Sequence, residues 1–287
     1  MTFDAFVGID WSGAKGTRHR GIQIARCKPG VAAPQVVPPA AGVWSRSAVL
    51  DWVIDASKAA RILVGLDFAF TLPYVDRGAY FPGVEQSPKD APGLWALVDT
   101  VAAGDGDYYA GAFVQTQPWG AYFHAPSAKG IRFSRRHKVV EAACARQGLG
   151  HPETVFHLIG PKQVGRGSLA GMRFLAALRR EAPAIHIWPF DTRGSRRSTV
   201  VEVFPRAFLG AAGHGPTKVR TVIDLNRALR AFGTEPTTRR GAIDDNVADA
   251  VMIAAALRTM AGDAALWRPG AMDARVRHTE GWIFGVR

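Results

Sequence analysis

The chain has 287 residues, of which 47% are apolar, so it can bury a sizeable core in one or two domains and is not a disordered tail protein. Its 36 Lys and Arg residues outnumber its 24 Asp and Glu residues, which gives a formal net charge of +12 at pH 7. A surface this basic attracts polyanions, so nucleic acid is the expected class of partner. A genomic preference for Arg is the alternative origin of the charge.

Cysteine content and N-terminal pattern predict the compartment. Cys27 and Cys144 are too few for a disulfide framework, and neither has the CxxC spacing of a zinc site. Asp4 stands where a signal peptide requires positive charge, and the longest apolar stretch, AVMIAAAL, is far shorter than the roughly 18 residues of a membrane span. We therefore expect a cytoplasmic protein that does not enter a membrane.

The first elements predicted along the chain are a hairpin, a helix and a strand. Residues 6–11 and 21–27 are typical strands joined by a Gly-rich turn, and helical spacing follows over residues 45–60. A second buried strand is expected at residues 61–70. The strand, helix, strand order predicts that the first and last of these strands pair in parallel.

The middle of the chain is rich in Gly, Pro and aromatic residues, and we expect residues 72–182 to be an insertion of loops and helices within one domain that spans residues 1–287. Helices are predicted at residues 93–103, 138–147 and 168–180, with Ser168 as the N-cap of the last. Two strands, 184–190 and 199–208, then precede a long helix at residues 244–260.

Two segments, VGIDWS and VGLDFA, place Asp10 and Asp67 at the ends of buried strands. Because ligands of parallel sheets gather at the carboxyl ends of the strands, the two carboxylates are expected to converge. Neighbouring carboxylates repel, and a hard divalent cation such as Mg²⁺ is the usual compensation. The alternative is that each Asp ends its strand through an Asx turn.

The helix at residues 244–260 begins with further acids. Asp245 and Asp249 are four residues apart and share one helix face. Asp244 and Asp245 also suit the first turn of a helix as capping residues, which is the alternative for them. Asp249 lies beyond that turn beside an apolar run, where a carboxylate needs a partner.

Glu202 lies inside the apolar strand VVEVF, and alternation places it on the face opposite Val201 and Val203. It is expected either to face water on an edge strand or to serve the acidic site as a ligand or an orienting carboxylate.

The order of these elements resembles the RNase H-like fold, an α/β fold in which carboxylates from the first strand, the fourth strand and the last helix hold two Mg²⁺ ions. The segments GIDWSGAKG, LVGLDFAF, PKQVGRGSLAGM, IHIWPFD, VVEVFPRAF, DDNVADAV and EGWIFGV resemble the domain of unknown function 429 family of predicted RNase H-like nucleases. That resemblance implies an RNase H-like mixed sheet with flanking helices.

The resemblance implies a nuclease with Mg²⁺ or Mn²⁺ as cofactor and nucleic acid as partner. Asp10, Asp67, Asp245 and Asp249 would hold the metal, and Glu202 completes the catalytic set. Two metal ions would activate a water and stabilise the leaving oxygen. Resolvases of this fold have acids three residues apart on the last helix, whereas Asn246 occupies that position here, so Asp245 and Asn246 both stay open as the second ligand. A resolvase-like homodimer is also implied, but no exposed apolar stripe argues for one.

Candidate substrate-binding residues are basic or polar and lie in predicted loops. The turn after the first strand offers Lys15, and the start of the helix after GPKQVGRGS offers anion-binding amides. Aromatic residues Trp119, Tyr122 and Phe123 precede the basic cluster RFSRRHK, a combination that suits a stacked nucleic-acid strand, and RGSRR at 193–197 is a second basic cluster. The full set is Lys15, Lys162, Gln163, Arg166, Arg135 and Arg136. Solvated loops are the alternative for all of them.

Two other functions stay open. An actin-like or sugar-kinase-type ATP-binding phosphotransferase shares the superfold, and GIDWSG resembles its first phosphate loop, but the chain has no second Gly-rich phosphate loop. The third is a non-catalytic nucleic-acid-binding module.

Overall fold

The computed structural model describes residues 2–160, 163–191, 197–213 and 218–287. Within these ranges six strands form one mixed sheet in the order β3-β2-β1-β4-β6-β5. The strands are β1 (Ala5–Asp10), β2 (Gln23–Cys27), β3 (Gln35–Val37), β4 (Ile62–Leu66), β5 (His186–Ile187) and β6 (Thr199–Glu202).

The sheet divides into an antiparallel and a parallel half. β1 pairs antiparallel with β2, and β2 pairs antiparallel with β3, whereas β4 pairs in parallel with both β1 and β6. β5 adds a parallel edge to β6. The predicted hairpin and the predicted parallel pairing are therefore confirmed, and the protein is an α/β protein with a mixed sheet and flanking helices.

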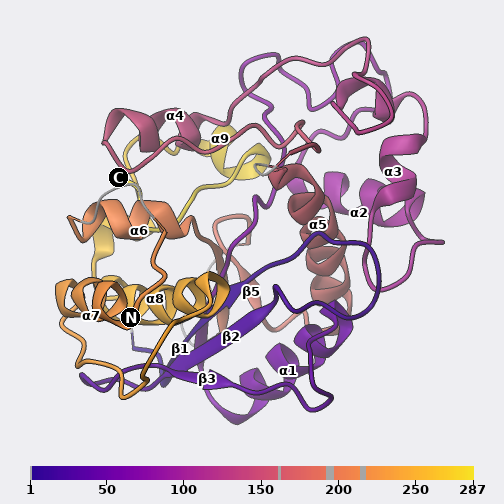
Figure 1. Cartoon of the computed structure of the whole chain (residues 1–287). Helices are drawn as coiled ribbons and strands as arrows, with labels where there is room; N and C mark the ends of the chain where they lie inside the picture. The colour runs from indigo at the N-terminus through magenta and orange to yellow at the C-terminus, as the bar shows by residue number, and fades with distance from the viewer. Residues whose placement is uncertain (1, 161–162, 192–196, 214–217) are drawn as a thin grey trace.

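The helices cover both faces of the sheet (Figure 1). One face packs mainly against α8, and the other belongs to the core that includes apolar residues of α1 and α5. The helical elements are α1 (Arg46–Ala59), α2 (Ala91–Val101), α3 (Gly111–Gln115), η1 (Trp119–Tyr122), α4 (Val139–Arg146), α5 (Val164–Glu181), α6 (Pro205–Ala211), α7 (Val222–Ala231), α8 (Asp245–Met260), η2 (Ala264–Trp267) and α9 (Ala274–Thr279).

Two predicted elements differ from the structure. α5 begins at Val164, so Ser168 is not its N-cap; the hydroxyl of Ser168 is buried, donates to the Val164 carbonyl at 3.0 Å and accepts from the Ala69 amide at 3.3 Å. β6 ends at Glu202 because Pro205 begins α6 instead of continuing the strand. None of the helices in the described ranges combines the length and the apolar character that crossing a bilayer requires.

Candidate active site

Asp10 and Asp67 meet at the carboxyl edge of the central parallel pair. Asp10 ends β1 and Asp67 directly follows β4, one position beyond the paired residues Ile9 and Leu66. The backbone N–H of Asp67 donates to the Ile9 carbonyl at 3.1 Å. The two carboxyl groups lie close enough for each to shift the pKa of the other. The acids converge as the sequence predicts, while their role as ligands stays a prediction.

Helix α8 brings Asp249 to the same place because two glycines let it approach the sheet closely. Gly8 and Gly65 are paired across β1 and β4. A Cβ on Gly8 would lie 2.1 Å from the Ala250 carbonyl oxygen, and one on Gly65 would lie 2.7 Å from a methyl group of Ile253. Both contacts are shorter than van der Waals contact, so only glycine fits. We call Asp10, Asp67 and Asp249 the carboxylate cluster.

Burial and mutual repulsion disfavour ionisation of the carboxylate cluster. Burial raises the pKa of Asp10 well above its usual range, and the charges of Asp67 and Asp249 add to the effect. Burial and the charge of Asp249 raise the pKa of Asp67 to about 8. Burial raises the pKa of Asp249 to about 7, although the positive charge of Lys218 opposes the shift. Metal-free, the cluster therefore retains protons near neutral pH.

Asp244 and Asp245 begin α8 with different contacts. The Asp244 carboxylate caps the helix by accepting from the backbone N–H groups of Asn246 and Val247, so the capping alternative holds for this residue. Asp245 instead forms an ion pair with Lys218, whose ammonium group lowers the pKa of the Asp245 carboxyl. Asp245 therefore lies at the rim of the site, and Lys218 is a site residue that the sequence did not indicate.

Glu202 forms a buried ion pair. It is 3% exposed, so the water-facing alternative is wrong: β6 lies between β4 and β5, not at the sheet edge. The Lys138 ammonium, itself fully buried, donates to one Glu202 oxygen at 2.5 Å, and the Phe70 amide donates to the other at 2.9 Å. Burial raises the pKa of Glu202 against the opposing charge of Lys138.

These contacts make Glu202 an orienting group. By holding the Phe70 amide, the Glu202 carboxylate fixes the segment that follows Asp67. Since both of its oxygens have protein partners, Glu202 has less capacity to bind a metal ion than the three members of the carboxylate cluster.

The donor chemistry of the cluster fits a hard divalent cation, because Mg²⁺ and Mn²⁺ prefer carboxylate oxygens. The side chains, however, are not arranged around one metal position. Over the ranges that the structure describes, no set of three or more His, Cys, Asp or Glu side chains is arranged so that it could hold a metal ion. A metal ion would require the side chains of the carboxylate cluster to give up their protons and turn toward one point.

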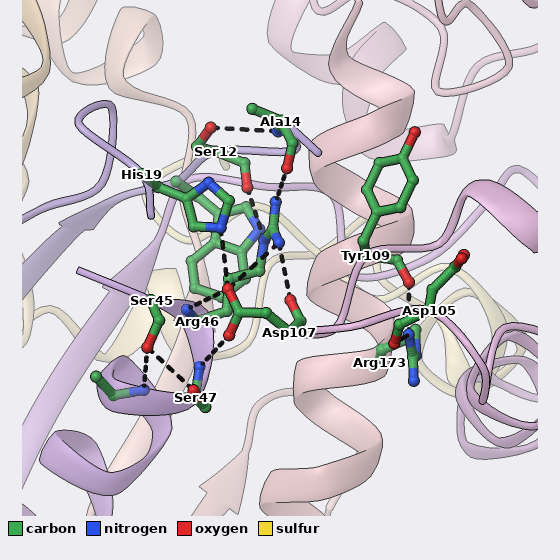
Figure 2. A network of polar contacts seen from close by, with 12 residues as sticks. Ser12, Ala14, His19, Ser45, Arg46, Ser47, Asp105, Asp107, Tyr109 and Arg173 are labelled. Atoms are coloured by element: carbon green, nitrogen blue, oxygen red, sulfur yellow. Dashed lines mark hydrogen bonds and ion pairs between the residues drawn. The ribbon is translucent and has the colours of Figure 1, made fainter. Parts of the chain in front are cut away.

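The turn that follows Asp10 is fastened by a buried arginine (Figure 2). The fully buried Arg46 guanidinium donates to the carbonyls of Ser12 at 2.9 Å, Ala14 at 2.6 Å and Asp107 at 2.8 Å. The Asp107 carboxylate in turn accepts from the backbone amides of Arg46 and Ser47. The turn is thus positioned by α1 and by a loop distant in sequence, which sequence patterns do not reveal.

Two groups of candidate substrate-binding residues lie on adjoining segments. A Cβ on Gly13 would lie 2.2 Å from the Gly167 amide nitrogen, so the turn that carries the exposed Lys15 packs against the start of α5. Gln163 is exposed and Arg166 is half-buried at that start. Lys162 lies outside the described residues, as do residues 193–196 of the second basic cluster.

The basic cluster RFSRRHK is only partly a surface feature. Arg135 is exposed, as a substrate-binding residue must be. Arg136 is 6% exposed and pairs with Asp76 at 2.6 Å, and it also donates to the carbonyls of Pro73, Tyr80 and Ala79. Arg136 is therefore not available to a substrate, because its guanidinium is fully used in holding this loop together.

The prediction that nucleic-acid bases stack on aromatic residues beside this cluster is wrong. Trp119, Tyr122 and Phe123 are 6%, 4% and 1% exposed and pack in the core with Phe81 and Phe113. They support the inserted segment and are not available to nucleic-acid bases.

Comparison of the chain with protein-family models, with curated proteins and with solved structures finds no match. We therefore infer the function from the geometry and chemistry of the site.

Proposed function

We propose that the protein is a metal-dependent nuclease that hydrolyses phosphodiester bonds in DNA or RNA at the carboxylate cluster. The observation that carries this proposal is the meeting of three acids at the carboxyl edge of the sheet: Asp10 at the end of β1, Asp67 directly after β4 and Asp249 of α8. The order of elements supports an RNase H-like fold and membership of the domain of unknown function 429 family: an antiparallel β1-β2-β3 unit, then α1, the parallel β4 and the late helix α8.

Each residue has a distinct part in the proposed reaction. Asp10, Asp67 and Asp249 would hold Mg²⁺ or Mn²⁺, with Asp245 at the rim as a further ligand. The bound metal would supply an activated water and stabilise the charge on the leaving oxygen. Glu202 keeps the segment after Asp67 in place through the Phe70 amide.

Substrate binding would use positive charge beside the cluster. Arg46 fixes the turn that presents Lys15, and Arg166 lies at the adjoining start of α5. A phosphate group approaching this turn would meet both side chains. The formal net charge of +12 favours a polyanionic substrate.

Cleavage assays with Mg²⁺ or Mn²⁺ on single-stranded, duplex and branched DNA and RNA test the proposal. We expect the wild type to cleave at least one of these, and Asp10→Asn to lower the rate by about 100-fold or more while remaining folded. Asp55→Asn changes an exposed Asp of α1 and is the matched control, expected to cleave as the wild type does. An Asp10→Asn rate equal to the wild-type rate would remove Asp10 from the site.

The same assays separate the alternatives. A non-catalytic binding module would retain nucleic acid in a gel-shift assay without cleaving it, and a phosphotransferase would hydrolyse or transfer the γ-phosphate of ATP instead. No described feature favours either over the nuclease.

A further inference from the structure

Lys218 places a positive charge at the rim of the acidic site. Its ammonium group forms an ion pair with Asp245, and 51% of the side chain is exposed. The charge of Lys218 opposes the rise in the pKa of Asp10, Asp67 and Asp249, which burial keeps raised. Asp245 lies one helical turn before Asp249 on the same face of α8, so the ion pair of Lys218 and Asp245 adjoins the carboxylate cluster.

The backbone that follows Lys218 is anchored, while the side chain of Lys218 lies at the rim of the site. Val219, the next residue, is 2% exposed and belongs to the core that includes α8. The Ile243 amide donates to the Arg220 carbonyl at 3.4 Å, which ties this segment to the residues just before α8. A lysine side chain on such an anchor has a flexible four-carbon stem, so its ammonium group can leave Asp245 without unfolding the segment.

The ammonium group of Lys218 and a divalent cation would compete for the oxygens of Asp245, the further ligand at the rim. Lys218 supplies a single positive charge to the partly exposed Asp245 carboxylate without full desolvation of either group. A divalent ion supplies two charges and binds carboxylate oxygens directly, so it would displace the ammonium group.

We propose that Lys218 is the internal counter-ion of the acidic site, which a divalent metal ion displaces, so that this lysine sets the metal affinity. The proposal rests on the proposed function, since it concerns the same site. Because Lys218 competes with the metal ion, the site would bind a divalent ion more weakly than the same carboxylates would bind it without this lysine.

Isothermal titration of Mn²⁺ into the wild type, Lys218→Met, Lys218→Arg and Lys58→Met tests this proposal. Lys58 pairs with Asp55 at 2.9 Å on the exposed face of α1 and is the matched control. We expect Lys218→Met to bind Mn²⁺ about three- to tenfold more tightly, as loss of one repulsive charge implies. Lys218→Arg and Lys58→Met should bind as the wild type does.

A second measurement needs no substitution. Acetic anhydride should acetylate Lys218 of the wild type faster when saturating Mn²⁺ is present, as read by mass spectrometry of the peptide, while Lys58 should be unaffected. Equal Mn²⁺ affinity of wild type and Lys218→Met, or weaker binding by the variant, overturns the role of Lys218 and leaves the proposed function intact. Absence of Mn²⁺ binding in both overturns the metal-dependent function and this inference together.

Discussion

The buried Lys138 ammonium group stabilises the charge of the Glu202 carboxylate beside the site. Both side chains are almost fully buried, and their charged atoms lie 2.5 Å apart. Lys138→Met would leave the Glu202 carboxylate without its counter-ion, so we expect it to lower the free energy of unfolding by about 3 kcal/mol or more. Urea unfolding followed by circular dichroism measures this change.

A double substitution provides the control for that prediction. Lys138→Met combined with Glu202→Met removes both charges. We expect this double variant to lose clearly less free energy of unfolding than the two single variants lose together. If the free energy of unfolding lost by the double variant equals the sum of the two single losses, the two side chains are not coupled and Lys138 does not stabilise Glu202.

The sequence predicts the acidic residues of the site better than it predicts the residues that pair with them. Asp10, Asp67 and Asp249 stand out because a carboxylate within an apolar run needs an explanation, and the structure brings them together. Lys138 lies 64 positions from Glu202, and such a distant ion pair has no local pattern. Arg136 is predicted as a substrate-binding residue because charge alone does not distinguish a surface arginine from a buried one.

The approach of α8 to the sheet is the element-scale feature on which the site depends. Gly8→Ala would place a methyl group 2.1 Å from the Ala250 carbonyl oxygen, so α8 must move away from β1. We expect a loss of about 1–3 kcal/mol in the free energy of unfolding, and weaker Mn²⁺ binding because Asp249 moves with the helix. Urea unfolding and Mn²⁺ titration check the two effects.

Gly104→Ala is the matched control for Gly8→Ala. A Cβ at this position meets no atom within 4 Å, so its effect on unfolding should stay within about 0.5 kcal/mol. Unchanged stability and unchanged Mn²⁺ affinity in Gly8→Ala would show that the close approach does not position Asp249.

The buried apolar elements are those that the sequence predicts well. α1, α8 and the strands β1, β2 and β4 lie where the apolar residues of the sequence place them. The start of α5 is displaced because Ser168 has the residue type of an N-cap but lies inside the helix and bonds to Ala69. α7 was not predicted, although Thr221 caps it by accepting from the Asp224 amide.

For the whole molecule, the raised pKa values predict how stability depends on pH. Asp67, with a pKa of about 8, and Asp249, with a pKa of about 7, hold protons in the folded state that the unfolded chain releases above about pH 4. The folded state binds more protons between these limits, so their contribution to the free energy of unfolding falls as the pH rises from about 4 to 8.

Comparison with Asp67→Asn isolates that contribution from other titrating groups. The difference in free energy of unfolding, wild type minus variant, should fall by about 1–3 kcal/mol between pH 5 and pH 8 in metal-free buffer. Thermal or urea unfolding at several pH values measures it. A difference that stays constant or rises with pH would mean that Asp67 is ionised in the folded protein throughout this range.

Whether the carboxylate cluster binds a divalent ion is the central question for the whole molecule. Isothermal titration of Mn²⁺ at pH 8, where ionisation of the cluster is most favourable, answers it with the wild type, Asp67→Asn and the exposed control Asp55→Asn. We expect saturable binding by the wild type and by Asp55→Asn, and affinity at least about tenfold lower in Asp67→Asn. Absence of binding by the wild type, or equal affinity in Asp67→Asn, would contradict it.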